Sequence, residues 1–190
     1  MISASVRRLL TGVVQAAALV ANPLSAVAGT GVCPGLLLHT AARLQGESPQ
    51  NVCQFAGRVL LVVNTARRCG YTPQYEALEE LHARYAPRRL ALLGFPSNDF
   101  NQEMKDNTAI ADFCFNTNGV KFPMFARTTM VGPGAHPFYA ALSKASGDAP
   151  RWNFHKFLID RSGRVVASFP SADDPFDTRV TTQIESLLDR

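Results

Sequence analysis

The chain is 190 residues long and 46% of its residues are hydrophobic, which is enough for one domain with a full core. Its net charge of +4 is small and dispersed, so nothing in the composition favours a nucleic-acid partner. No internal repeat, linker or low-complexity tract divides the chain further.

The first 28 residues have the pattern of a secretory signal peptide. Two arginines stand near its start, an apolar stretch follows, and a small-x-small cleavage site ends at Ala28. The apolar stretch is too short and too often interrupted for a convincing transmembrane helix, so we expect no stable membrane insertion. The predicted division is therefore a leader at 1–28 and one domain at 29–190.

The leader predicts secretion to an oxidising compartment such as a periplasm. Because no acidic residue precedes Glu47, targeting to an organelle by a transit peptide is the alternative. In an oxidising compartment, Cys33 and Cys53 are best interpreted as a structural disulfide, the alternative being that one of them is a free thiol. A metal site is not expected there, since no His or Cys pair stands at ligand spacing around either cysteine.

Between these cysteines, 36–38 and 39–44 are expected to form two short strands around a turn-rich break at 45–49. The apolar, β-branched run at 59–63 then predicts a fully buried strand. Thr72 is predicted to cap a helix that begins at the next residue, a proline, and has apolar residues at helical spacing.

Cys69 lies between the buried strand and the start of this helix, directly after Arg67 and Arg68. Positive charge and the helix dipole both favour thiolate over thiol, and the thiolate is the nucleophilic form. We therefore interpret Cys69 as a reactive thiol. The alternative is that it is one more small buried hydrophobe.

The predicted elements after this helix are a strand at 89–95, a polar loop at 96–103, a helix at 106–116, a short strand entry at 119–125, a Gly/Pro-rich loop at 128–137, a helix at 138–143, a hairpin over 156–169 and a helix at 175–188. Two buried strands joined by a helix imply a parallel pair, and the hairpin adds antiparallel strands, so we expect an α/β fold with a mixed sheet. Loops at the carboxyl ends of parallel strands share one edge, so Cys69 should face the loop at 96–103.

Five stretches in this order together resemble the glutathione peroxidase family. They are V-L-L-V-V-N-T-A-R-R-C-G-Y-T-P-Q-Y at 59–75, G-F-P-S-N-D-F at 94–100, Q-E at 102–103, F-P-M-F at 122–125 and W-N-F-H-K-F-L-I at 152–159. The resemblance implies a thioredoxin-like fold, with a central mixed sheet flanked by helices. It also implies a thiol peroxidase that reduces hydrogen peroxide and organic or lipid hydroperoxides, with no cofactor and with glutathione or thioredoxin as reductant.

The same resemblance implies that Cys69, Gln102, Trp152 and Asn153 are the catalytic residues. A thiolate attacks one peroxide oxygen, and the two amides and the indole N–H are neutral donors suited to the negative charge on the other oxygen. Without the resemblance, Trp152 would be interpreted as a core aromatic and Asn153 as a turn residue. The chain departs from the family pattern in having Cys instead of selenocysteine, Ser97 and Asp99 in the second motif, and a loop one residue shorter before Gln102.

Cys114, on the predicted helix at 106–116, matches a resolving cysteine used by fungal-type members of the family. It would attack the sulfenic acid of Cys69 to give a disulfide, which a thioredoxin-like partner would reduce; we expect Cys114 to be half-buried. The alternative is that Cys114 only packs in the core and that a small thiol such as glutathione reduces Cys69 directly. The span between 125 and 152 is short and lacks the longer insertion that tetrameric animal members of the family use for assembly, so the resemblance implies a monomer or weak dimer.

Two other functions are weighed against the peroxidase. A thioredoxin-like disulfide exchange protein would normally have a second cysteine three residues after Cys69, and this chain has Thr72 there. A non-enzymatic peroxide sensor would not need donors for the leaving oxygen such as Gln102, Trp152 and Asn153.

Overall fold

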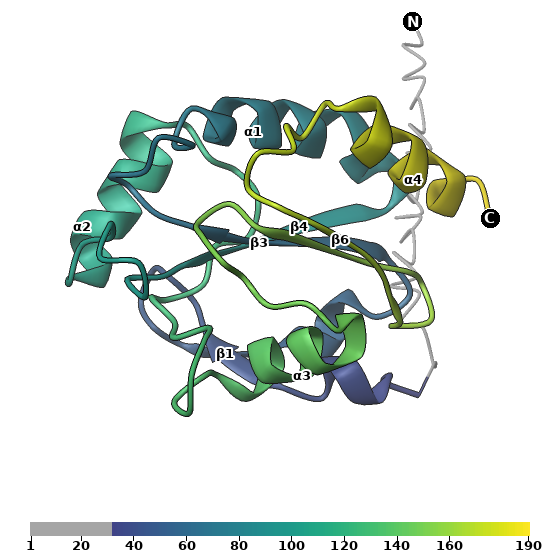
Figure 1. Cartoon of the computed structure of the whole chain (residues 1–190), viewed down its shortest axis with the longest axis horizontal. Helices are drawn as coiled ribbons and strands as arrows, with labels where there is room; N and C mark the ends of the chain where they lie inside the picture. The colour runs from purple at the N-terminus through teal and green to yellow at the C-terminus, as the bar shows by residue number, and fades with distance from the viewer. Residues whose placement is uncertain (1–31) are drawn as a thin grey trace, which may run out of the picture.

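A four-stranded mixed sheet forms the centre of the protein (Figure 1). The computed structural model describes residues 32–190, so the predicted leader at 1–28 lies outside the described residues. The strands are β3 (Val59–Thr65), β4 (Leu90–Pro96), β5 (Lys156–Ile159) and β6 (Val165–Phe169), in the order β4-β3-β5-β6. β3 is parallel to β4 and antiparallel to β5, which is antiparallel to β6. The expected α/β fold with a mixed sheet is confirmed.

Helices cover both faces of this sheet. On one face lie α1 (Gln74–Tyr85) and α4 (Thr178–Leu188), and on the other lie α3 (Pro137–Ser146) and a hairpin of β1 (Thr40–Ala42) and β2 (Pro49–Asn51) (Figure 1). Successive side chains of a strand point to opposite faces, so Leu61 and Val63 pack under α1 and α4, while Leu60 and Val62 pack under α3. Every residue of β3 and β4 is therefore buried, which explains their near-continuous apolar sequence.

Several local predictions were wrong in detail. Residues 36–38 were expected to be a strand, but Gly35–Leu37 is a 3₁₀ helix, and the second strand of the hairpin is β2, which follows the turn. The expected strand entry at 119–125 makes only isolated bridges, one of Met124 to Gly94 and one of Phe125 to Arg43. Two further 3₁₀ helices, Val52–Phe55 and Ala86–Arg88, complete the connections.

The predicted helix at 106–116 forms in two parts. Asp106 caps it, its carboxylate accepting from the amides of Thr108 and Ala109 at 3.2 Å, and α2 then runs over Asn107–Ala111. From Asp112 to Thr117 the chain continues as a π-helix. This wider turn is rare and is found mostly at functional sites, and here it contains Cys114.

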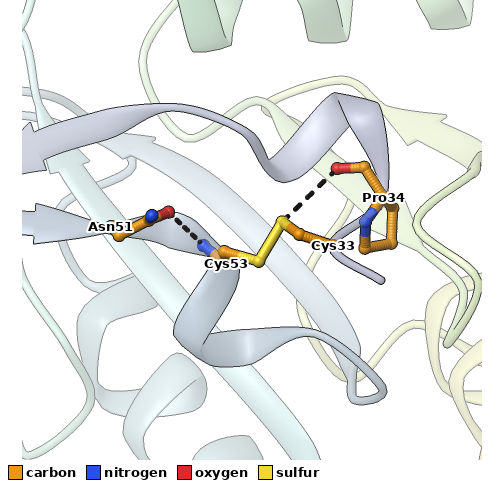
Figure 2. The surroundings of a disulfide bond; sticks show 4 residues. All are labelled: Cys33, Pro34, Asn51 and Cys53. Carbon is orange, nitrogen blue, oxygen red and sulfur yellow. Dashed lines mark hydrogen bonds between the residues drawn. A yellow bond between two sulfur atoms is a disulfide. The ribbon is translucent and has the colours of Figure 1, made fainter. Parts of the chain in front are cut away.

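A disulfide joins Cys33 to Cys53, as expected (Figure 2). Their Cα atoms are 5.8 Å apart, and 20 positions separate them in the sequence. Asn51 caps the 3₁₀ helix that contains Cys53, its Oδ1 accepting from the Cys53 amide at 2.9 Å. A crosslink over a loop of this length stabilises a fold by about 3 kcal/mol, and here it joins Cys33 to the 3₁₀ helix that follows β2. Among residues 32–190, no helix is long and apolar enough to cross a membrane.

Candidate active site

Cys69 lies in the turn between the end of β3 and the start of α1, and only 7% of it is exposed. Thr72 holds this turn closed: its hydroxyl accepts from the Cys69 amide at 3.1 Å and faces the carbonyls of Ala66 and Arg67 at 3.1 and 3.0 Å. Thr72 was predicted to cap α1, and that prediction was wrong because the side chain turns back into the loop. The Tyr71 amide points at the Cys69 sulfur at 3.4 Å, where an N–H donor stabilises negative charge.

Gln102 and Asn153 are in direct contact beside this turn. Asn153 Nδ2 donates to Gln102 Oε1 at 2.9 Å, and the Arg68 amide, next to Cys69, donates to the Gln102 carbonyl at 2.9 Å. The expectation that Cys69 and the loop at 96–103 lie at one edge of the sheet is therefore supported by these contacts. Asn153 is fully buried.

Trp152 differs from these residues because it is 40% exposed. Its ring lies 5.2 Å from that of Phe100, centroid to centroid. Its carbonyl accepts from Asn64 Nδ2 at 3.1 Å, at the end of β3. Trp152 is therefore not a core aromatic: its backbone is fixed to the sheet while its indole stays at the surface beside the loop that carries Gln102.

Arg67 connects the turn that carries Cys69 to the segment that carries Cys114. Its guanidinium lies over the Phe113 ring, 5.1 Å from the centroid, and its Nη1 contacts the sulfur of Met104 at 3.0 Å. Glu103 lies near the same guanidinium; burial raises the pKa of its carboxyl, and Arg67 opposes this shift.

Cys114 is fully buried rather than half-buried as expected, and both it and Cys69 are free thiols. Its sulfur lies 3.5 Å from the hydroxyl of Tyr75. Burial raises the pKa of the Cys114 thiol to about 11, with the negative charge of Glu103 adding to the shift and the Tyr75 hydrogen bond opposing it. At neutral pH Cys114 is therefore protonated in this conformation.

The departures at Ser97 and Asp99 form contacts of their own. The fully buried Ser97 accepts from the Asp99 amide through its hydroxyl at 3.2 Å. The Asp99 carboxylate in turn accepts from the amides of Met130 and Val131 at 2.6 and 3.2 Å. Asp99 therefore ties the loop of Gln102 to the Gly/Pro-rich loop before α3, a role that the sequence pattern did not indicate.

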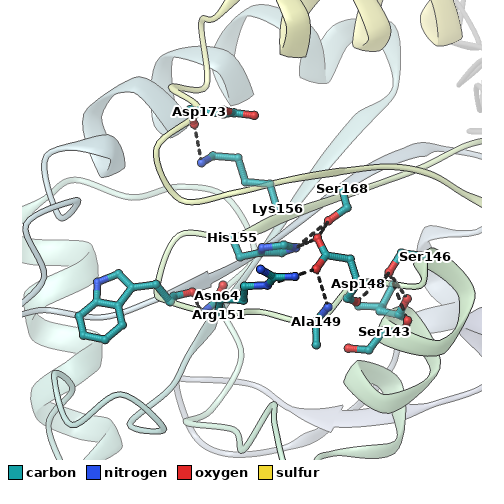
Figure 3. A network of polar contacts seen from close by, with 12 residues as sticks. Asn64, Ser143, Ser146, Asp148, Ala149, Arg151, His155, Lys156, Ser168 and Asp173 are labelled. Carbon is teal, nitrogen blue, oxygen red and sulfur yellow. Dashed lines mark hydrogen bonds and ion pairs between the residues drawn. The ribbon is translucent and has the colours of Figure 1, made fainter.

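A buried polar network follows Asn153 in the chain (Figure 3). His155 is 3% exposed, and its Nε2 lies 2.8 Å from the Ser168 hydroxyl, which donates to Asp148 at 2.8 Å. Burial lowers the pKa of His155 to about 4; Asp148 opposes this shift, and Lys156 and Arg151 add to it. His155 is thus a neutral, hydrogen-bonded core histidine that anchors the start of β5.

This network predicts acid sensitivity. Since the pKa of His155 is about 4 when folded and 6.5 when unfolded, the unfolded chain binds the extra proton first as pH falls. Stability is complete above pH 6.5 and is lost toward pH 4, by about 2 kcal/mol at pH 5. Urea unfolding at pH 7.5 and 5 measures this, with His155→Gln as the control that lacks the titrating ring. Equal losses in both proteins would contradict the assignment.

The chain is similar to several known proteins. The profile of the glutathione peroxidase family matches residues 37–143. A glutathione peroxidase of Lactococcus lactis is 43% identical over 154 residues, which cover 78% of this chain and 96% of the relative. The hydroperoxy fatty acid reductase gpx1 of Synechocystis is 41% identical over 152 residues, or 74% of this chain and 89% of the relative.

The crystal structure of GPX1 from T. cruzi matches with a TM-score of 0.63 at 27% identity, covering 81% of this chain and 96% of that one. The thioredoxin-like fold that the sequence resemblance implied is therefore confirmed. Within residues 32–190, no group of three or more His, Cys, Asp or Glu side chains is arranged to hold a metal ion. The chain belongs to the glutathione peroxidase family and is a peroxide-reducing oxidoreductase.

Proposed function

We propose that Cys69 is the peroxidatic nucleophile and that Gln102, Asn153 and Trp152 stabilise the leaving oxygen. The thiolate of Cys69 attacks the nearer oxygen of a peroxide, an S–O bond forms as the O–O bond breaks, and the distal oxygen leaves as an alcohol or water after taking up a proton. The products are the sulfenic acid of Cys69 and the reduced peroxide. Sulfur loses two electrons and the peroxide gains them.

The hydrogen bond between Asn153 and Gln102 carries this proposal. Because Gln102 Oε1 already accepts from Asn153, the remaining polar group of the Gln102 side chain is its amide donor. Asn153 Nδ2 has a second N–H that this bond does not use. Both amides are fixed before a substrate arrives, so they can meet developing negative charge without reorganising. The indole N–H of Trp152 is a third neutral donor.

Substitutions distinguish the proposed role of Cys69 as nucleophile from the proposed role of Gln102 and Asn153 as hydrogen-bond donors. Cys69→Ser should abolish peroxide reduction, whereas Asn153→Ala and Gln102→Ala should each lower the second-order rate constant with hydrogen peroxide about 100-fold, the typical effect of losing one such donor. Alkylation of Cys69 by iodoacetamide should continue in both alanine variants, because that reaction has no oxygen leaving group. Stopped-flow peroxidase assays and alkylation rates provide the two measurements.

Gln54→Ala is the matched control, since the Gln54 side chain is exposed and, among the described residues, hydrogen-bonds only to Gln50, four positions before it. It should retain the full rate. Turnover that survives Cys69→Ser would contradict the nucleophile. If the Asn153 and Gln102 variants react with hydrogen peroxide at the wild-type rate, these two side chains do not stabilise the leaving oxygen. Cys69 would then be a reactive thiol without catalytic donors, as expected of a non-enzymatic sensor.

We further propose that Cys114 resolves the oxidised Cys69. Its thiol would attack the sulfenic sulfur, forming the Cys69–Cys114 disulfide and releasing the sulfenic oxygen as water. The contacts of Phe113 with Arg67 and of Cys114 with Tyr75 must break first, since Cys114 is fully buried. The π-helix that contains Cys114 supports this step, because such turns are rare and are found mostly at functional sites. A thioredoxin-like protein would then reduce the disulfide.

Peptide mapping tests this resolving role. After one equivalent of hydrogen peroxide, mass spectrometry should find a Cys69–Cys114 disulfide in the wild-type chain and stable Cys69 sulfenic acid in Cys114→Ser. Tyr75→Phe should speed disulfide formation severalfold, because it removes the hydroxyl that contacts the Cys114 sulfur, with alkylation of Cys114 as a parallel measure of its release. Sulfenic acid in the wild-type chain with Cys114 unchanged would instead assign the resolving step to glutathione or another small thiol.

The peroxides proposed as substrates are hydrogen peroxide and organic or lipid hydroperoxides; the name of the Synechocystis relative supports the lipid class. We also propose that the chain is exported to an oxidising compartment and acts as a monomer or weak dimer. The disulfide between Cys33 and Cys53 supports export. Mass measurement of the exported chain should find cleavage after Ala28, whereas an uncleaved chain in the cytoplasmic fraction would contradict export.

A further inference from the structure

Phe154 has a backbone conformation that its side chain disfavours. Its φ angle is +67°, in the left-handed region that a bulky residue occupies only when its surroundings impose it. Phe154 directly follows Trp152 and Asn153, and its own ring is fully buried, 5.4 Å from Tyr75 in an edge arrangement. At this turn the chain changes direction: the Phe154 ring packs in the core, whereas Trp152 and Asn153, the two proposed donors before it, lie beside Gln102 and Phe100.

Asn64 holds one side of this turn. Its Nδ2 donates to the Trp152 carbonyl at 3.1 Å, and its own carbonyl accepts from the Phe154 amide at 2.6 Å. The Asn64 amide also donates to the His155 carbonyl at 3.3 Å. Asn64 is fully buried within β3, so a single residue of the central strand contacts the backbone of three of the four positions from 152 to 155.

Lys156 holds the other side. Its ammonium donates to the carbonyls of Phe154 and Asp173, at 2.8 Å each, and Figure 3 shows the side chain extended toward Asp173. Lys156 is fully buried, which is rare for a lysine unless it is paired. Burial lowers its pKa to about 8, a shift that Asp174 and Asp177 oppose.

The partners of Lys156 show that it is not an ordinary buried ion pair. It binds Asp173 through the backbone carbonyl, while the carboxylate of Asp173 pairs with Arg179. An apolar residue of the same volume often stabilises a core as well as a buried charge does, or better. A buried ammonium that binds two carbonyls is therefore poorly explained by stability alone, and one of those carbonyls belongs to the strained Phe154.

We propose that Asn64 and Lys156 are positioning residues of the peroxidase site, which hold the turn at Phe154 so that Trp152 and Asn153 face the leaving oxygen. Asn64 fixes the carbonyl before Asn153, and Lys156 fixes the carbonyl after it. The side chain between them then lies within hydrogen-bond distance of Gln102. This inference rests on the proposed roles of Trp152 and Asn153.

Lys156→Met tests the inference, because methionine has a similar volume and lacks the donor. The rate constant for oxidation of Cys69 by hydrogen peroxide should fall at least tenfold, since a 1 Å misplacement of a catalytic group costs about 100-fold. The chain has a single tryptophan, so its fluorescence anisotropy reports on Trp152 alone and should fall. Asn64→Leu removes the side-chain hydrogen bond to the Trp152 carbonyl and should also lower the rate constant and the anisotropy. The test therefore remains possible if one of the two variants does not fold.

The matched control is Leu142→Ala, which opens the core under α3 on the opposite face of the sheet and should keep the wild-type rate despite its lower stability. A wild-type rate in both Lys156→Met and Asn64→Leu, or an equal loss of rate in Leu142→Ala, would overturn the positioning role.

A chain that lacks both proposed donors shows whether Lys156 acts through Trp152 and Asn153. In a Trp152→Phe/Asn153→Ala chain, the loss of Cys69 thiol is followed by titration, and adding Lys156→Met should slow it less than about twofold because positioning residues act through the groups they position. A further tenfold loss there would mean that Lys156 acts elsewhere and would overturn the inference. If this background itself reacts at the wild-type rate, the proposed donors fail, and the positioning role fails with them.

Discussion

The hydrogen bond from Asn153 to Gln102 is the contact on which the site depends. It joins two loops that leave different strands of the sheet, one after β4 and one before β5. Both strands pair with β3, whose own carboxyl end leads to Cys69. The proposed nucleophile and donors thus lie near one another because three adjacent strands place their ends at one edge. Each loop is fixed there by backbone hydrogen bonds, so the amides keep their direction with no substrate bound.

The two free cysteines have different surroundings. Cys69 lies in a tight turn with an amide directed at its sulfur, whereas Cys114 is buried in the core beside a tyrosine hydroxyl. Burial keeps Cys114 protonated and away from peroxide, which suits a thiol that should react only with oxidised Cys69. The same burial means that the proposed resolving step requires local unfolding, and Cys114 lies in a π-helix, a rare turn found mostly at functional sites.

The sheet and the turn that carries Cys69 were predictable because they follow from local patterns. The apolar runs of β3 and β4 are those of strands covered on both faces, and Cys69 follows the first of them at a helix start. The contacts of individual polar side chains were not predictable in this way. Thr72 fits a helix cap in sequence, but its hydroxyl has better partners in the loop. Asn64 and Lys156 could have been noticed as polar residues within buried strands, yet only the structure shows that both bind the turn after Asn153. The role of Asp99 depends on a loop some thirty residues away in sequence, which no local pattern reveals.

The central claim is that the fold makes Cys69 a faster peroxide reductant than an ordinary thiol. The most direct measurement is a single-turnover reaction of the fully reduced chain with hydrogen peroxide, quenched rapidly and mapped by mass spectrometry over a range of peroxide concentrations. The account predicts oxidation of Cys69 first, with a second-order rate constant at least about 100-fold above that of free cysteine at the same pH. A rate equal to that of free cysteine, or oxidation of Cys114 before Cys69, would contradict it.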